Sequence, residues 1–190
     1  MNFPYRFKVV FLSFLAVFIC YIDRVNISVA IIPMQQQFGW SESQVGIILG
    51  SFYFGYMITM TLGGYLADKY GGKRVLGYGL LIWSFFTIIT PVFAYSGLWF
   101  LILIRILMGL GEGITFPSWH AIYARWIPFE ERTRAIAVTN SGISFGTVFG
   151  YLATAIIIAQ YSWEWVFYSF GILLTEQPSV LILRLNLLNS

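Results

Sequence analysis

The chain has 190 residues, of which 58% are hydrophobic and only 10% are charged, and its mean hydropathy is +0.77. Soluble domains carry about 25% charged residues, so this composition excludes a soluble globular domain and predicts an integral membrane protein. The single cysteine, Cys20, cannot form an internal disulfide, and the single histidine, His120, leaves no histidine pair for a haem. We expect no metal, no cofactor, no nucleic-acid partner and no enzymatic activity.

Six apolar segments, each long enough to cross a bilayer, divide the chain. They run over about 7–33, 44–66, 75–95, 98–124, 135–159 and 163–183. This pattern predicts an all-α membrane protein with a six-helix bundle. The sixth helix is expected to be atypical or truncated, because Glu176 and Pro178 fall inside it. We therefore assign 1–171 to the bundle and 172–190 to a divergent C-terminal tail.

The cations between the segments are distributed unevenly. If the segments alternate in direction, eight of them share one side of the membrane: Arg6, Lys8, Lys69, Lys73, Arg74, Arg125, Arg132 and Arg134. The opposite connections, 34–43, 96–97 and 160–164, contain no lysine or arginine. The positive-inside rule then predicts a multi-pass protein with a cytoplasmic N-terminus.

Glycines recur every fourth residue in two segments and predict close helix packing, because small residues let backbones approach in lipid. The fifth segment has such a series, and the second has a shorter one. They are Gly142, Gly146 and Gly150, and Gly46 and Gly50.

The fourth segment carries two ionisable residues far from either end. Arg105 and Glu112 are about two helical turns apart and so face nearly the same way. Asp23 and Arg24 interrupt the first segment in the same manner. An ionised group at mid-bilayer costs roughly 2.5–3.5 kcal/mol, so these four side chains are expected to line a wet interior cavity.

The two arginines have the chemistry of an anion site. From the expected segment ends, Arg24 and Arg105 lie roughly 14 and 10 Å below the outer surface, at 1.5 Å per residue. Two guanidinium groups at one level suit a carboxylate, sulfonate or phosphate. The alternative is a structural ion pair between one arginine and Asp23 or Glu112. The two readings overlap, because a carboxylate that takes up a proton releases its arginine.

This exchange predicts a coupling mechanism. Burial raises the pKa of a carboxyl group and a neighbouring arginine lowers it. Glu112 is the expected coupling residue, and Asp23 is the expected second proton site. Whether sodium replaces the proton is left open.

Three further residues are weaker candidates. Tyr53 and Tyr56 are predicted either to line the cavity or to pack within the bundle. His120 is predicted either to relay protons or contact substrate, or to hydrogen-bond to a neighbouring helix.

Several stretches resemble a known family. Residues 64–74, GYLADKYGGKR, resemble the loop between helices two and three of the major facilitator superfamily. Residues 21–26, 105–113 and 116–120 resemble its anion:cation symporter branch, which includes vesicular glutamate transporters, sialin, sodium–phosphate cotransporters and bacterial sugar-acid permeases. The resemblance implies that the chain is the N-terminal half of a twelve-helix transporter that works by alternating access.

The resemblance also implies roles for individual residues. Arg24 and Arg105, with Tyr21 and Tyr53, would bind an organic anion, and Asp23 and Glu112 would carry protons. A gating motif would comprise Gly64, Asp68, Gly71, Lys73 and Arg74. In it, Asp68 and Arg74 would help to latch the cytoplasmic side in the outward-open state.

The expected function is therefore proton-coupled transport of carboxylates, sugar acids or phosphate. The expected partners are a small anionic substrate, a proton or sodium ion, the lipid bilayer, and a second copy or a missing C-terminal half. The alternative is a truncated, non-transporting membrane fragment that acts only by association with another half.

Overall fold

The computed structural model describes residues 5–186, with side chains from Arg6 to Thr175, and every regular element in this range is a helix. The elements are α1 (Tyr5–Phe38), α2 (Glu42–Tyr70), α3 (Gly72–Ser96), α4 (Leu98–Gly113), α5 (Thr115–Trp126), α6 (Phe129–Gln160) and α7 (Trp163–Asn186). Because α4 and α5 continue one another, these seven elements form the six expected membrane-spanning segments.

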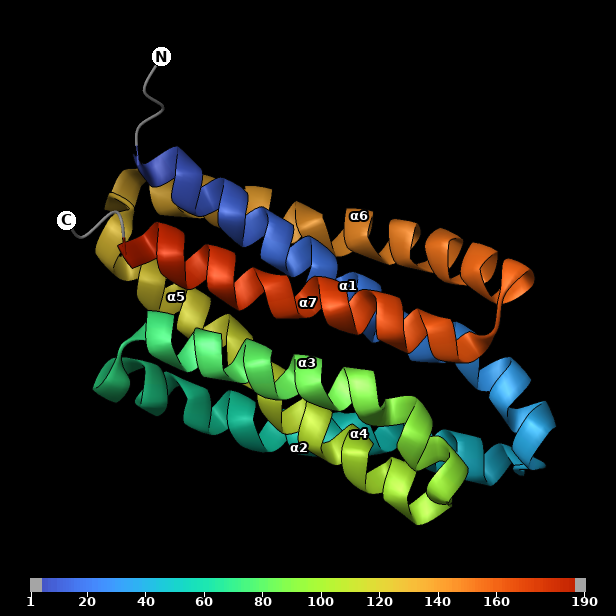
Figure 1. Ribbon diagram of the computed structural model, residues 1–190. Helices are drawn as coiled ribbons and strands as arrows, with labels where there is room; N and C mark the ends of the chain where they lie inside the picture. The colour runs from blue at the N-terminus through green and yellow to red at the C-terminus, as the bar shows by residue number, and fades with distance from the viewer. Residues whose placement is uncertain (1–4, 187–190) are drawn as a thin grey trace.

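The helices run up and down a single bundle (Figure 1). α1 packs on α6, α2 on α4, and α3 on both α4 and α7. Both chain ends lie at one end of the bundle, called here the N-terminal end, together with the α2–α3 and α5–α6 connections. All eight cations of the asymmetric connections belong to this end, so the alternation predicted from the sequence is confirmed.

Five helical spans in the described part of the chain are long and apolar enough to cross a membrane. They are Arg6–Phe38, Glu42–Tyr70, Gly72–Ser96, Leu98–Trp126 and Phe129–Gln160. The sixth, α7, continues as helix to Asn186. Our expectations for the Glu176 and Pro178 side chains lie outside the residues whose side chains are described, and the boundary at 171/172 stays a prediction.

The fourth segment is broken near its middle, which the sequence analysis did not predict. α4 ends at Gly113 and α5 begins at Thr115. Pro117 lacks a backbone N–H and cannot donate to the carbonyl of Gly113, four residues earlier. Helical bonding resumes one residue later, where the Ser118 N–H donates to the Ile114 carbonyl over 3.2 Å.

The first helix is longer than predicted. We expected it to end near Pro33, but Pro33 lies inside α1, which continues through the glutamines to Phe38. Gly39 ends the helix with φ at +68°, a left-handed conformation that glycine adopts without steric cost. The N–H groups of Gly39 and Trp40 both donate to the Gln35 carbonyl, so the polar run is the last helical turn and its cap rather than a loop.

The predicted glycine series have different outcomes. A Cβ on Gly142 would lie 2.9 Å from the Phe14 carbonyl oxygen of α1. A Cβ on Gly146 would lie closer still to the Phe18 carbonyl oxygen, and one on Gly150 would lie 2.9 Å from the Ile22 Cα. The prediction for α6 is therefore confirmed. The prediction for Gly46 and Gly50 is wrong, because within the described structure nothing lies within 4 Å of a Cβ at either position.

Two helices are much more exposed than the others. In their most apolar windows only 17% of α2 and 22% of α6 is buried, against 56–61% for the other three spans. Large apolar side chains are exposed along α2, including Phe54 and Met57, and along α6, including Phe145 and Leu152. α2 and α6 therefore form the outer walls of this bundle.

Candidate anion and proton site

An ion pair between α1 and α4 lies at the centre of the candidate site. The Arg24 guanidinium, through Nη2, pairs with Oε1 of Glu112. The Glu112 side chain is 1% exposed and that of Arg24 is 15% exposed. Cys20, one turn before Arg24 on α1, donates its Sγ–H to the same Oε1 over 3.3 Å. The second oxygen, Oε2, is buried without a hydrogen-bond partner.

The length of α1 explains why Arg24 meets Glu112. Because α1 continues to Phe38, Arg24 lies about 21 Å below its outer end, at 1.5 Å per residue. Glu112 lies about 21 Å below the start of α4 by the same rise, whereas Arg105 lies about 10 Å below it. The expectation that the two arginines share one level is therefore wrong, because it placed the end of the first helix too early.

Aromatic rings surround the Arg24 guanidinium. Its central carbon lies 4.7 Å from the ring centroid of Tyr21 and 4.9 Å from that of Tyr56. The buried ring of Phe52 is 5.6 Å from the same carbon and 4.9 Å from the guanidinium carbon of Arg105. Both arginines thus reach one aromatic ring from different depths, an arrangement that stabilises cations away from water.

Arg105 is the more deeply buried of the two arginines, with 3% of the residue exposed. Its Nη1 contacts the Met108 sulfur over 3.7 Å, and its Nε is buried without a partner. No carboxylate of the described residues forms an ion pair with it. The structural ion-pair reading of the sequence therefore applies to Arg24 and Glu112 but not to Arg105.

Asp23 faces a different helix from Arg24. Its Oδ2 accepts hydrogen bonds from Trp83 Nε1 over 2.6 Å and from Thr87 Oγ1 over 3.1 Å, both on α3. Its Oδ1 is buried without a partner. The sequence analysis missed Trp83 and Thr87. The signal was present, because Ser84, Thr87 and Thr90 place hydroxyls in the middle of an apolar segment, far from its ends.

The predicted tyrosines and His120 differ in how close they lie to this cluster. Tyr21 accepts a hydrogen bond from Arg24 Nη1 over 3.4 Å. The Tyr53 ring contacts Phe52 with its centroid 5.3 Å away and is 53% exposed. His120 is exposed, and its Nδ1 lies 2.8 Å from the Phe116 carbonyl of its own helix. The bond to a neighbouring helix that we expected for His120 is not formed.

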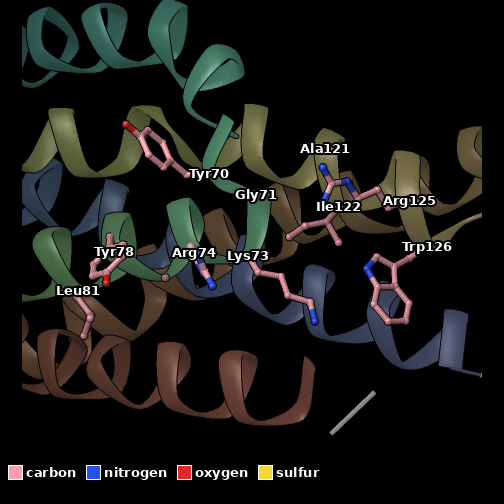
Figure 2. Close-up of a pocket in the computed structure, with 12 residues that line it drawn as sticks. Tyr70, Gly71, Lys73, Arg74, Tyr78, Leu81, Ala121, Ile122, Arg125 and Trp126 are labelled. Carbon is pink, nitrogen blue, oxygen red and sulfur yellow. The ribbon is translucent and has the colours of Figure 1, made fainter. Parts of the chain in front are cut away.

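The predicted gating motif lies at the N-terminal end, around the α2–α3 turn. Gly71 occupies the turn with φ at +87°, and Gly64 and Asp68 lie on the last turns of α2. Lys73 and Arg74 begin α3, and both line a cavity beside the end of α5 (Figure 2). Asp68 and Arg74 are exposed, and the two ion pairs of the described residues involve neither of them.

The centre of the bundle thus combines two cations and two carboxylates that are incompletely paired. Arg24 Nε and Arg105 Nε are buried donors without partners, and Asp23 Oδ1 and Glu112 Oε2 are buried acceptors without partners. Buried polar groups are normally satisfied. The spare donors are suited to binding an anion, and the spare carboxylate oxygens are suited to exchanging protons.

Comparisons with known proteins identify relatives of this chain. The chain is 47% identical over 170 residues to a chloroplast ascorbate transporter of Arabidopsis thaliana, a match that covers 90% of this chain and 31% of that protein. It is 46% identical over 170 residues to a chloroplast sodium-dependent phosphate transport protein of the same plant, covering 90% and 32%. The chain thus spans about a third of the length of these relatives.

Solved structures share the fold at lower identity. A bacterial homologue of the human lysosomal transporter Spinster, in an inward-facing and occupied conformation, superposes with a TM-score of 0.85 at 21% identity, covering 96% of this chain and 45% of that one. The proton:xylose symporter XylE gives a TM-score of 0.83 at 19% identity, covering 94% and 44%. Residues 13–175 match the sequence profile of the Major Facilitator Superfamily. With a matching bundle of helices and this profile over most of its length, the chain belongs to the major facilitator superfamily.

Proposed function

We propose that this chain forms the N-terminal half of a proton-coupled anion transporter, in which Arg24 and Arg105 bind the anion and Glu112 and Asp23 carry protons. The observation that carries the proposal is the buried ion pair between Arg24 and Glu112. Relatives named as ascorbate and phosphate transporters support the anionic substrate class.

The ion pair supplies the coupling step. When Glu112 takes up a proton, it loses the charge that holds Arg24, and an unpaired guanidinium in an apolar interior is unfavourable. A carboxylate or phosphate that enters the site restores the pairing with two parallel N–H donors. Release of the anion returns Arg24 to ionised Glu112, so anion and proton are bound and released together.

Arg105 serves as the second cation of the site. It lacks a carboxylate partner among the described residues and shares the Phe52 ring with Arg24. An anion between the two guanidiniums would give Arg105 a directly contacting negative charge, which the carboxylates of the described residues do not provide. Tyr21 and Tyr53, which lie beside Arg24 and Phe52, would then contact the substrate.

Asp23 is assigned the second proton. Its Oδ2 is held by neutral donors from α3, and its Oδ1 is unpartnered. A proton on Oδ1 would neutralise the carboxylate without breaking either hydrogen bond to Oδ2. Asp23 would thus change charge while keeping α1 attached to α3.

The N-terminal end is proposed to face the cytoplasm, because the eight cations of the connections gather there. The α2–α3 turn would then provide the cytoplasmic gate. In this arrangement the exposed Asp68 and Arg74 would pair with groups of the opposing half when the outer side is open.

A second candidate is a fragment that acts only by association with another half. It is favoured by the exposed walls on α2 and α6. The opposing half could be a C-terminal half or a second copy. The two candidates differ in whether this half contains a working anion and proton site.

A chimera tests this difference. Residues 7–171 would replace the matching segment of the Arabidopsis ascorbate transporter, and the purified chimera would be reconstituted in liposomes. We expect uptake of radiolabelled ascorbate or inorganic phosphate driven by an inward proton gradient, and no uptake by the 190-residue chain alone. A sodium gradient at equal pH on both sides is the matched arm that separates sodium from proton coupling.

Two variants of the chimera test the assigned roles. Glu112→Gln should lose uptake driven by the pH gradient but keep anion exchange at equal pH, because the anion can still pair with Arg24. Arg105→Ala should lose both. Uptake that both variants leave unchanged would refute the assignment of this site.

A further inference from the structure

The cavity beside the α2–α3 turn lies outside the anion and proton site. It has a volume of about 770 Å³ and lies at the N-terminal end, between the α2–α3 turn and the end of α5. Figure 2 shows Lys73 directed toward Trp126, with Arg74 next to it on the first turn of α3 and Arg125 on α5. This cavity is called the basic pocket below.

The basic pocket is lined by three cationic side chains and by no acidic side chain. Lys73, Arg74 and Arg125 are the only ionisable side chains other than tyrosine among its twelve lining residues. Glycine brings the two helices together, since a Cβ on Gly72 would lie 2.7 Å from the Ser118 carbonyl oxygen of α5. Like charges that line one pocket repel one another, so an anion in the pocket would relieve their repulsion.

The start of α3 adds to the positive potential. Gly71 caps this helix and has no side chain that can accept from the first-turn N–H groups. These groups carry the positive end of the helix dipole, which favours anions and phosphates in particular. The first turn of α3 also carries Lys73 and Arg74, so backbone and side chains reinforce one another.

The outer wall of the pocket is apolar and aromatic. Tyr78 is 67% exposed and Leu81 is 46% exposed, and both follow Arg74 along α3 toward the middle of the bilayer. Trp126 closes the other side, with the Lys73 ammonium 5.1 Å from its ring centroid. Cations beside tyrosine and tryptophan at the end of a spanning helix are typical of the headgroup level of a membrane.

We propose that the basic pocket binds a phosphate group, and that the phosphate of an anionic phospholipid headgroup is its occupant. Arg74 and Arg125 hold the phosphate, and an acyl chain lies along Tyr78 and Leu81. A free phosphate ion has the same charged chemistry but gains nothing from the apolar wall. The site differs from the central pair of arginines and does not depend on transport.

Fluorescence quenching of the purified 190-residue chain in phosphatidylcholine nanodiscs tests the proposal. Brominated phosphatidylglycerol is added, and brominated phosphatidylcholine serves as the neutral control. The difference between the fluorescence of the wild type and that of Trp126→Phe gives the contribution of Trp126, the tryptophan that lines the pocket. We expect Trp126 to prefer the anionic lipid by about fivefold, with a preference that falls as salt rises.

Single variants identify the cations responsible. Arg74→Gln and Arg125→Gln should each reduce the preference to about twofold or less. Arg134→Gln is the matched control, because Arg134 is an exposed cation of the same end that does not line this pocket. It should keep the wild-type preference.

Competition with inorganic phosphate distinguishes a lipid headgroup from a soluble phosphate ion as the occupant. If millimolar inorganic phosphate displaces the brominated anionic lipid, the phosphate site is supported and its occupant is the soluble ion. If phosphate does not displace it, the lipid headgroup is the occupant. Equal quenching of wild-type Trp126 by the two lipids overturns the proposal, and so does a preference that is insensitive to salt. Both results are measured on the wild type, so they hold even if a variant fails to fold.

Discussion

Among the residues with described side chains, two carboxylates are buried in the bundle, and they have different kinds of partner. Glu112, with Arg24 and Cys20, forms the Glu112 cluster, in which the strongest contact is to a cation. Asp23, with Trp83 and Thr87, forms the Asp23 cluster, in which both donors are neutral. The carboxylates come from different helices, yet α1 takes part in both clusters through adjacent residues, Asp23 and Arg24.

This difference separates an exchangeable contact from a fixed one. In the proposed mechanism, the cation of the Glu112 cluster leaves its carboxylate for a substrate anion of the same chemistry. The indole and hydroxyl of the Asp23 cluster have no competitor of that kind, so they hold α1 against α3 whichever anion is present. We therefore expect the Glu112 cluster to control anion binding. The Trp83 and Thr87 hydrogen bonds of the Asp23 cluster should control stability, while Asp23 itself carries the second proton.

The largest effect is expected from Arg24→Ala. It leaves Glu112 unpaired in the interior, and loss of one partner of a buried ion pair costs about 3–5 kcal/mol, with the lower end expected because the Arg24 side chain is 15% exposed. Uptake by the chimera should also fall by about 100-fold. Loss of about 3 kcal/mol of contact with the anion has this effect on binding, at 1.4 kcal/mol for each factor of ten. Thermal unfolding in detergent and initial uptake rates measure the two effects.

Arg6→Ala is the matched control for Arg24→Ala. Arg6 is also an α1 arginine in an ion pair, with Glu131 at 2.9 Å, but both side chains are more than 40% exposed. An exposed pair of this kind contributes about 0–1 kcal/mol. If the two variants lose similar stability and similar uptake, the Glu112 cluster has no special role.

Trp83→Phe should separate stability from transport. The substitution keeps an aromatic ring and removes the N–H that Asp23 Oδ2 accepts over 2.6 Å. A hydrogen bond to a charged group contributes about 1.5–3 kcal/mol, so the free energy of unfolding should fall by that amount. The KM for the anion should change by less than about twofold, because the lost hydrogen bond is to Asp23 and not to either arginine that binds the anion.

Trp99→Phe provides the comparison for Trp83→Phe, since Trp99 is 75% exposed. An exposed substitution of this kind should change stability by no more than about 0.5 kcal/mol. Loss of anion affinity in Trp83→Phe with unchanged stability would instead place the Asp23 cluster in the substrate site.

Phe52→Leu tests whether the two arginines act together. The ring lies within 6 Å of both guanidinium carbons, and a cation–π contact is worth about 0.5–2 kcal/mol. The KM for the anion should therefore rise several-fold, as measured by uptake at increasing substrate concentration. Phe54→Leu, an exposed site on the same helix, should leave the KM unchanged, and an equal effect at both sites would contradict a shared role for Phe52.

Cys20→Ala should give the smallest effect. The thiol is a weak donor to Glu112 Oε1 at 3.3 Å, so its removal should cost about 0.5–1.5 kcal/mol of stability. Cys20→Ser keeps a donor at this position and should recover part of the loss in thermal unfolding. A serine variant less stable than the alanine variant would show that Cys20 acts through apolar packing alone.

Much of the fold could be predicted from the apolar segments and the placement of cations between them. The ends of the helices could not, because proline is a weaker stop in a membrane bundle than we assumed. α1 passes through Pro33 and stops only at Gly39, whereas Pro117 interrupts the fourth segment. Neighbouring helices re-satisfy the freed backbone groups in some places and not in others, and sequence spacing does not reveal which.

The residues of the candidate site could be predicted from the sequence, but most of the contacts between them could not. The cost of burying charge singled out Asp23, Arg24, Arg105 and Glu112. Which arginine meets which carboxylate depended on the true end of α1, so the pairing of Arg24 with Glu112 needed the structure. Trp83 was not predicted, because an indole in an apolar segment is expected to pack against its neighbours. Only the structure shows that its N–H donates to Asp23.

The most direct test of the exchange between Glu112 and the substrate is the number of protons taken up when an anion binds. Isothermal titration of the reconstituted chimera with ascorbate or phosphate, in two buffers of different ionisation enthalpy, gives this number. Exchange at Glu112 predicts net proton uptake on anion binding in the wild type and a clear decrease in Glu112→Gln. Equal proton uptake in both proteins, or none in the wild type across the pH range of transport, would contradict the account.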